Sequence, residues 1–365
     1  MHKIRLSYDF IVEGEGHATP VDGVHHPLTQ LLQTVSQQGS IRAAAAHLGL
    51  SYRYVWGELK RWEARLGYPL ITWGKGQSAR LSAMGFKLMW AERQAQAQLA
   101  PQIQALRADI ERSFATAFNP DAPVVKLYAS HDAAVSLLQQ EAPRHGIYMD
   151  VRFSGSVDAI RALNEGRCEL AGFHVPAGAD AKSIVAGTYK PLLKPGFHKV
   201  VGFAKRQLGL IVQKGNPLQL QLPPDLVKTR ARFALRALGA GTRVSLQHWL
   251  AGADLTLADL NPLANDALSH QAVAASIASG DADAGFGIES AALSHDLDFL
   301  PCMEETYFLV CRKSYLDSEA MLALRHYLAG NSWAGAMSRL QGYQPHKIGA
   351  VTALSAELPW WSFKG

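Results

Sequence analysis

The sequence has little cysteine, no long apolar run and no signal peptide. Its 365 residues include three cysteines, Cys168, Cys302 and Cys311, which are far apart and form no CxxC pair. A disulfide framework and a zinc site are therefore not expected. No apolar stretch reaches the about 20 residues of a membrane span, and the start, MHKIRLSYDFIVEGEG, lacks the basic end and apolar block of an export signal. We therefore expect a cytoplasmic protein without a membrane partner.

The positive charge is unevenly distributed. The whole chain carries a formal net charge of only +5, yet eight lysines and arginines stand against two glutamates between Gly39 and Trp90. A local excess of this kind is typical of a surface that neutralises phosphates, although a solvated basic face is the simpler alternative. Because the chain also exceeds one domain of about 100–200 residues, we expect two or three folded units, one of them binding nucleic acid.

The first 82 residues predict a winged helix-turn-helix domain. Alternating apolar residues in 1–26 indicate a β-hairpin, and LTQLLQTVSQQ then indicates a helix that ends at Gly39. Ser40 is placed to cap the short helix IRAAAAHL and Ser51 to cap the next helix, with Gly49 at the turn between them. In PLITWGKGQSARLS two short extended pieces surround two glycines, which indicates a basic wing.

Residues 83–118 predict a linker and dimerisation helix. An apolar seam repeats at steps of three and four residues through Ile103, Leu106, Ile110 and Phe114. So narrow a seam favours a partner helix, and hence a homodimer or tetramer. Pro101 lies inside this run, so two successive helices are an alternative to one. Residues 119–123 predict a short linker.

The pattern changes to alternating strands and helices in residues 124–365, which predicts a two-lobed α/β domain with a mostly parallel sheet and a cleft. The expected strands include VVKLYA, MDVRFS and ELAGFHV, then KVVGFA paired with LGLIVQ, and later LDFLP and TYFLVC as separate strands. Four loops near strand ends open helices, at residues 130–132, 154–156, 239–243 and 269–271. Their hydroxyls, backbone N–H groups and helix dipoles suit a small oxyanion or carboxylate, although each is also an ordinary helix cap.

The segment GSIRAAAAHLGLSYRYVWGELKRWEARLGYPLI, with the wing and ARLSAMGFKLM, resembles the DNA-binding domain of ModE-type molybdate-responsive regulators and, more distantly, LysR-type regulators. The resemblance covers about residues 1–115. It implies binding to double-stranded operator DNA. Arg53 would contact a base edge, and the other residues named in the next sentence would contact the DNA backbone. The expected DNA-binding residues are Ser40, Arg42, Ser51, Tyr52, Arg53, Lys75 and Arg80.

Residues 124–344 resemble the type-2 periplasmic-binding-protein fold, as fused to such helix-turn-helix domains in bacterial regulators. The resemblance rests on ASHD, SGSVDAIRALNEGRCELAGFHV, GLIVQKGNP, RALGAGTRVSLQHWL and SHQAVAASIASGDADAGFGIESAA. It implies that the four loops face one interlobe cleft. The expected ligand-binding residues are Ser130, His131, Ser154, Ser156, His174, Thr242, Arg243 and His270.

Together these features predict a one-component transcriptional regulator that is not an enzyme and needs no cofactor. Its effector would be a molybdate- or tungstate-like oxyanion, or formate or another small carboxylate. The spacing of the histidines does not predict a metal site. The alternatives are a cytoplasmic solute-binding protein and an anion-processing enzyme of the same fold, but no nucleophile, base and orienting group can be picked out together.

Overall fold

The computed structural model describes residues 26–73, 79–118 and 123–361. The chain divides into two compact units, Met1–Ala100 and Pro101–Gly365, which meet inside one helix. The predicted hairpin in residues 1–26 and Lys75 lie outside the described residues, apart from His26. The predicted boundaries at residues 82, 118 and 123 stay predictions.

The first unit contains the helix-turn-helix that the capping residues predict. It comprises α1 (Pro27–Gln38), α2 (Ile41–His47) and α3 (Tyr52–Leu66), followed by the paired strands β1 (Ile71–Thr72) and β2 (Arg80–Leu81). Gly39 ends α1 in the left-handed region at φ 69°. The hydroxyls of Ser40 and Ser51 accept hydrogen bonds from Ala43 N and Tyr54 N, both at 3.1 Å, and so start α2 and α3.

The core of this unit fixes the orientation of α3. Leu32, Ile41, Val55 and Leu59 are buried, so the opposite side of α3 faces solvent. The helix α4 (Ala83–Phe118) begins directly after β2 and continues through Pro101. Of the two alternatives for residues 83–118, the structure therefore has one helix, in which Pro101 supplies no N–H for a helical hydrogen bond.

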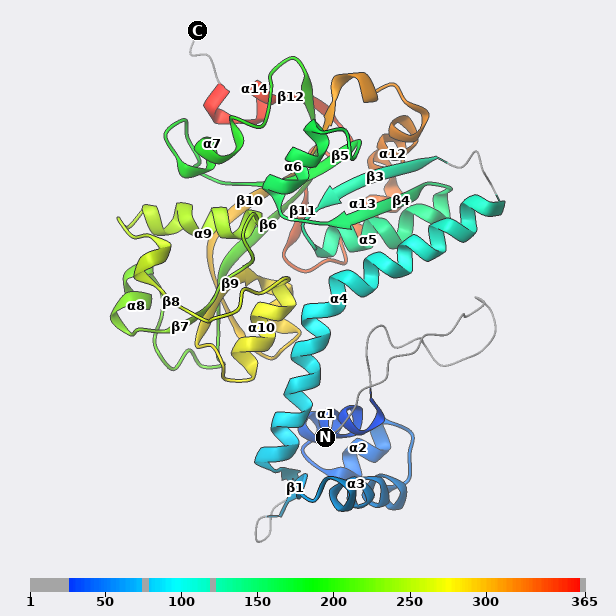
Figure 1. The fold of residues 1–365 in the computed structure, drawn as a ribbon, viewed down its shortest axis with the longest axis vertical. Coiled ribbons are helices and arrows are strands. Elements are labelled where there is room, and N and C mark those ends of the chain that lie inside the picture. Colours follow the sequence, from blue (N-terminus) through cyan, green and yellow to red (C-terminus); the bar gives the residue numbers. More distant parts are fainter. Residues whose placement is uncertain (1–25, 74–78, 119–122, 362–365) are drawn as a thin grey trace. The chain divides into compact units, whose positions relative to one another are not determined.

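The second unit is built on a single mixed sheet with helices packed around it (Figure 1). The strand order is β4-β3-β5-β10-β6-β9-β7-β8, with β11 and β12 also paired to β6. The strands are β3 (Val124–Ala129), β4 (Tyr148–Phe153), β5 (Leu170–Pro176), β6 (His198–Val212), β7 (Arg232–Ala234), β8 (Asn261–Pro262), β9 (Ala284–Ile288), β10 (Asp298–Arg312), β11 (Tyr343–Pro345) and β12 (Val351–Ala353).

Two long antiparallel strands connect the lobes. The first half of β6 pairs with β11 and β12, whereas its second half pairs with β9. The second half of β10 pairs with β5. The first lobe thus contains β3–β5 with α5 (Ala133–Glu141), α6 (Ser156–Asn164), α7 (Ile184–Tyr189), α12 (Glu319–Ala329), α13 (Asn331–Met337) and α14 (Leu354–Glu357). The second contains β7–β9 with α8 (Pro223–Lys228), α9 (Gly241–Ala251), α10 (His270–Ala278) and α11 (Glu289–Leu293).

Two predictions about these strands were wrong. KVVGFA and LGLIVQ do not pair with each other but are the two halves of β6, and LDFLP and TYFLVC are the two halves of β10. The charged residues in the middle of β6 and β10 are paired across the two strands. Lys205 Nζ lies 2.6 Å from Glu304 Oε1, and Arg206 Nε lies 2.6 Å from Glu305 Oε1. Because β6 and β10 are antiparallel to their neighbours, the sheet is mixed rather than mostly parallel.

Candidate functional site

The four predicted loops open helices at the junction of the two lobes. They precede α5, α6, α9 and α10, and Asp132 Oδ1 and Ser269 Oγ cap the first and last of these. The loops of the two lobes touch, because a Cβ added to Gly155 would lie 2.3 Å from the Gly239 carbonyl. Val157 N also donates to Gly239 O at 3.4 Å. Only glycine at position 155 permits this approach of the two backbones.

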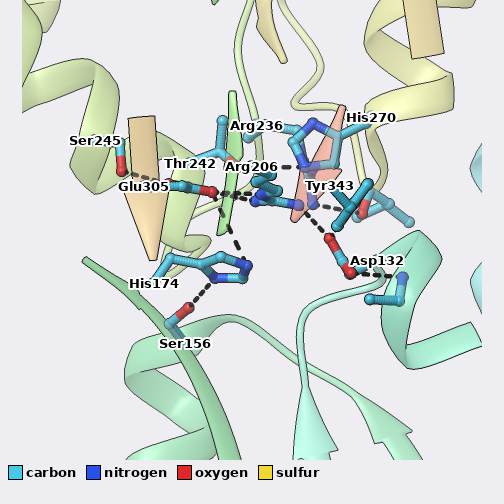
Figure 2. A network of polar contacts seen from close by, with 12 residues as sticks. Asp132, Ser156, His174, Arg206, Arg236, Thr242, Ser245, His270, Glu305 and Tyr343 are labelled. Carbon is cyan, nitrogen blue, oxygen red and sulfur yellow. Dashed lines mark hydrogen bonds and ion pairs between the residues drawn. The ribbon is translucent and has the colours of Figure 1, made fainter. Parts of the chain in front are cut away.

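A buried ion-pair network lies where β6 and β10 cross between the lobes (Figure 2). Arg206 on β6 stands opposite Glu305 on β10, and its Nε is 2.6 Å from Glu305 Oε1. Its Nη1 donates to Asp132 Oδ2 in the loop before α5. Arg206, Asp132 and Glu305 are at most 2% exposed. One arginine therefore joins two carboxylates from separate parts of the domain, and their charge raises its pKa well above the usual value despite burial.

Hydroxyl groups hold both carboxylates in place. The Tyr343 hydroxyl on β11 donates to Asp132 Oδ2 at 2.7 Å, and the Ser245 hydroxyl on α9 donates to Glu305 Oε2 at 3.0 Å. Burial raises the pKa of Glu305, whereas Arg206 opposes this shift. Residues of β6, β11 and α9 thus fix the orientation of the two acidic groups around Arg206.

A second arginine, Arg236, is buried beside this network but has different hydrogen-bond partners. It follows β7, is 5% exposed, and donates through Nη2 to Leu268 O at 3.2 Å. Its Nε and Nη1 have no hydrogen-bond partner among the described residues, and neither do Ser130 Oγ and His270 Nδ1. Burial and the charge of Arg206 lower the pKa of Arg236 to about 10, so it stays protonated at neutral pH. The two guanidinium nitrogens are thus donors without acceptors in a site shielded from water.

Three predicted histidines surround the network. His174 Nδ1 is 3.3 Å from Ser156 Oγ, and its ring stacks on Tyr307 at 3.8 Å between centroids. His270 Nε2 is 3.4 Å from Thr242 Oγ1. His131 Nε2 is 3.0 Å from Oε1 of Gln104, a residue of α4. One edge of the site therefore contacts the helix that leads to the first unit.

These histidines are neutral at physiological pH. Burial, followed by the charge of Arg236, lowers the pKa of His131 to about 4. Burial and the two arginines lower the pKa of His174 and of His270 well below the usual value. The site's charge at neutral pH therefore comes from the arginines and carboxylates alone.

The neutral histidines predict an acid-sensitive fold. Below pH about 6.5 the unfolded chain binds a proton at each imidazole that the folded chain does not, so stability falls with falling pH. His270→Gln removes one such group. Its free energy of unfolding should therefore depend less steeply on pH below 6, by up to about 1.4 kcal/mol per pH unit. Urea unfolding between pH 5 and 7.5 measures this slope. His47→Gln, at an exposed position on α2, should keep the parent slope; an unchanged slope in His270→Gln would contradict a buried neutral imidazole.

The structure brings together most of the predicted ligand-binding residues. Ser130, Ser156, His174, Thr242 and His270 are buried at the junction. The Ser154 hydroxyl is also buried and has no partner among the described residues. Arg243, in contrast, points to the edge of the site, where its Nη1 donates to Asp266 Oδ2 and Arg236 O, both at 2.8 Å.

Sequence reasoning missed the charged centre of the site. Its additional members are Asp132, Arg206, Arg236, Ser245, Glu305 and Tyr343. One signal was available: Lys205-Arg206 and Glu304-Glu305 interrupt two otherwise apolar strand patterns. Isolated charge pairs inside apolar runs are expected to be buried and paired rather than to form turns.

Six of the seven predicted DNA-binding residues lie in the described part of the first unit. Arg42, Tyr52, Arg53 and Arg80 are exposed, whereas Ser40 and Ser51 are helix caps. In the described part of the chain no helix is long and apolar enough to cross a membrane. The same residues contain no group of three histidine, cysteine or acidic side chains that could hold a metal ion.

The fold and site define a two-lobed ligand-binding domain that follows a winged helix-turn-helix. Comparison with protein families agrees with this division. Residues 137–329, just over half of the chain, match the family described as PBP superfamily domain. Residues 28–86 match the family described as bacterial regulatory helix-turn-helix protein, lysR family. The chain therefore belongs to the PBP superfamily and carries a LysR-type helix-turn-helix domain at its N-terminal side.

Curated relatives are similar over part of their length. The uncharacterized protein YvgK of Bacillus subtilis is 29% identical over 200 residues, which are 55% of this chain and 64% of YvgK. This chain thus spans less than two thirds of that relative. An uncharacterized protein of Clostridium pasteurianum, in the 5′ region of a 2Fe-2S ferredoxin gene, is 30% identical over 87 residues, covering 24% of this chain and 77% of the relative.

Solved structures with similar chain organisation include ArgP from Mycobacterium tuberculosis and a probable transcriptional regulator from Pseudomonas aeruginosa. ArgP is 15% identical, with a TM-score of 0.39 and coverage of 82% of this chain and 94% of ArgP. The second is 13% identical, with a TM-score of 0.40 and coverage of 81% and 94%.

Proposed function

We propose that this protein is a one-component transcriptional regulator whose winged helix binds operator DNA and whose interlobe site binds a small anion. One observation supports this most: a LysR-type helix-turn-helix at residues 28–86 shares a chain with a PBP domain whose interlobe site contains unpartnered buried donors. Molybdate, tungstate and formate are the effector candidates.

The proposal assigns DNA contact to the exposed end of α3. Arg53 reads a base edge, while Ser40, Arg42, Ser51, Tyr52, Lys75 and Arg80 position the phosphate backbone. Three of the six backbone-positioning residues are cationic, so we expect the logarithm of DNA affinity to fall with the logarithm of salt concentration with a slope of about −2.7 or steeper. Duplexes that bind the full-length protein can be selected from a genomic pool. Measuring their affinity at increasing salt concentration tests the expected slope. A flat salt dependence would contradict the proposed interface.

The contact between His131 and Gln104 supports communication between the site and α4. His131 belongs to the loop that also contains Ser130 and Asp132, and Gln104 additionally accepts from Ser136 Oγ at 3.2 Å. A ligand that binds one arrangement of this loop better than another would shift the equilibrium between them. The part of α4 around Gln104 would then move with the loop.

Dimerisation through α4 is also part of the proposal. Leu106 and Phe114 are 61% and 54% exposed, and Ile103 and Ile110 are half-buried. Leu106→Glu combined with Ile110→Glu should give monomers that bind DNA poorly, because paired helix-turn-helix domains read two half-sites. Light scattering measures the mass. Ser113→Glu, at an exposed polar position of α4, is the control and should keep the mass of the parent oligomer. If the double variant also keeps that mass, this seam is not the dimer interface.

One observation favours an anion-processing enzyme instead. Ser156, His174 and Glu305 form a line, with His174 Nδ1 3.3 Å from Ser156 Oγ and His174 Nε2 4.0 Å from Glu305 Oε1. The second distance is too long for a hydrogen bond, and Glu305 is already bound by Arg206 and Ser245. We therefore favour binding over catalysis at this site.

A further inference from the structure

The two buried arginines of the interlobe site differ in their acceptors. Arg206 is bound to both Asp132 and Glu305. Arg236 is equally buried, yet the described residues supply no carboxylate within hydrogen-bond distance of it, and its Nε and Nη1 have no partner there. A buried guanidinium without a paired anion is unfavourable unless an acceptor reaches it. Arg236 is thus the cation in this site that remains available to a ligand.

Two further unpartnered polar atoms accompany Arg236. His270 Nδ1 and Ser130 Oγ are buried and lack a hydrogen-bond partner among the described residues. Arg236 follows β7 in the second lobe, whereas Ser130 belongs to the loop that opens α5 in the first. An acceptor held between Arg236 and Ser130 would satisfy donors of both lobes, which favours closure of the lobes on it.

The charges of the site limit the charge of this acceptor. Arg206 and Arg236 stand against Asp132 and Glu305, and the surrounding histidines are neutral. These four charges sum to zero, so a monoanion beside the unpaired Arg236 brings the sum to only −1. A dianion such as molybdate or sulfate would add two, next to carboxylates that are already fixed by Tyr343 and Ser245. Uncompensated buried charge is strongly disfavoured, so the singly charged ligand is favoured.

We propose that Arg236 holds the anionic group of the effector and that the effector is a small monoanion of the carboxylate class. This inference rests on the proposed anion-sensing function and names the ligand class and the residue that selects it. It decides between the two candidate classes, since it favours formate-like anions over molybdate and tungstate. The guanidinium of Arg243 is already bound to Asp266 and to the Arg236 carbonyl.

Calorimetry on the full-length protein tests the inference with formate and acetate as monoanion probes and molybdate and sulfate as dianion probes. A monoanion should bind, and both dianions should bind at least about tenfold more weakly. Arg236→Gln should weaken the monoanion by about 10- to 150-fold, the loss expected for a charge-assisted hydrogen bond. Arg232→Gln, in an exposed ion pair with Asp283 of the same lobe, is the control and should stay within about threefold of the parent.

Each outcome decides a different point. Binding of dianions only, or monoanion binding that is the same in Arg236→Gln, would overturn the inference and leave an anion sensor in place. Binding of none of the four probes would reject the proposed small-anion function and the inference with it. Arg236→Gln should also keep the parent melting temperature without ligand, because it removes an unpaired buried charge. If that variant is unfolded, Arg236 is structural and the inference fails.

Discussion

Replacing Arg206 with methionine is expected to lower the free energy of unfolding of the second unit by about 3–5 kcal/mol. Arg206 is the cation that joins Asp132 and Glu305, and all three side chains are excluded from solvent. Methionine has a similar volume, so the main loss is the partner of two buried carboxylates. Urea unfolding followed by tryptophan fluorescence measures the change.

The control is an arginine–carboxylate ion pair at the surface. Arg232 Nη2 lies 2.6 Å from Asp283 Oδ1, but these side chains are 48% and 25% exposed. Arg232→Met should therefore cost no more than about 1 kcal/mol, since exposed ion pairs contribute little. Equal losses in the two variants would mean that burial of the Arg206 network does not set its contribution.

Replacing Arg53 with alanine is expected to weaken binding to a selected operator by about 1–3 kcal/mol and to relax preference at one base pair. Arg53 is exposed in the first turn of α3, where the helix faces away from the core residues Val55 and Leu59. Competition among operators that differ at single positions measures the effect. Arg61→Ala is the control, because Arg61 is already paired with Glu58 on the same helix.

The two possible roles of Arg53 give different results. If it reads a base edge, the loss is concentrated in operators with the preferred base. If it contacts phosphate, the loss is uniform over all sequences and the salt slope falls by about one. Unchanged affinity for every operator would show that α3 does not enter the DNA groove as proposed.

The sequence was most informative where structure depends on near neighbours. Ser40 and Ser51 cap helices through bonds to residues three positions away, and Gly39 ends a helix by its own backbone conformation. Such short-range signals can be recognised in a single sequence, and they predicted α1, α2 and α3. The four loops of the second unit were found for the same reason, since each contains its own helix start.

Prediction failed where the partners are distant in the chain. Arg206 and Glu305 are 99 residues apart, and Tyr343 is 211 residues from Asp132. Without knowledge of these pairings, β6 and β10 were each predicted as two shorter strands. Arg243 was expected at the anion because of its position in a glycine-rich loop, but Asp266, in a different loop, binds its guanidinium.

The central claim is that anion binding between the lobes changes DNA binding by the same chain. The most direct measurement is the affinity of the full-length protein for its selected operator with and without saturating formate, at an ionic strength kept constant with potassium chloride. We expect formate to change the affinity by at least about fivefold, the lower end of ordinary allosteric coupling, and Arg236→Gln to abolish the change. Equal operator affinities of the parent protein with and without formate, despite calorimetric binding of formate, would contradict the account.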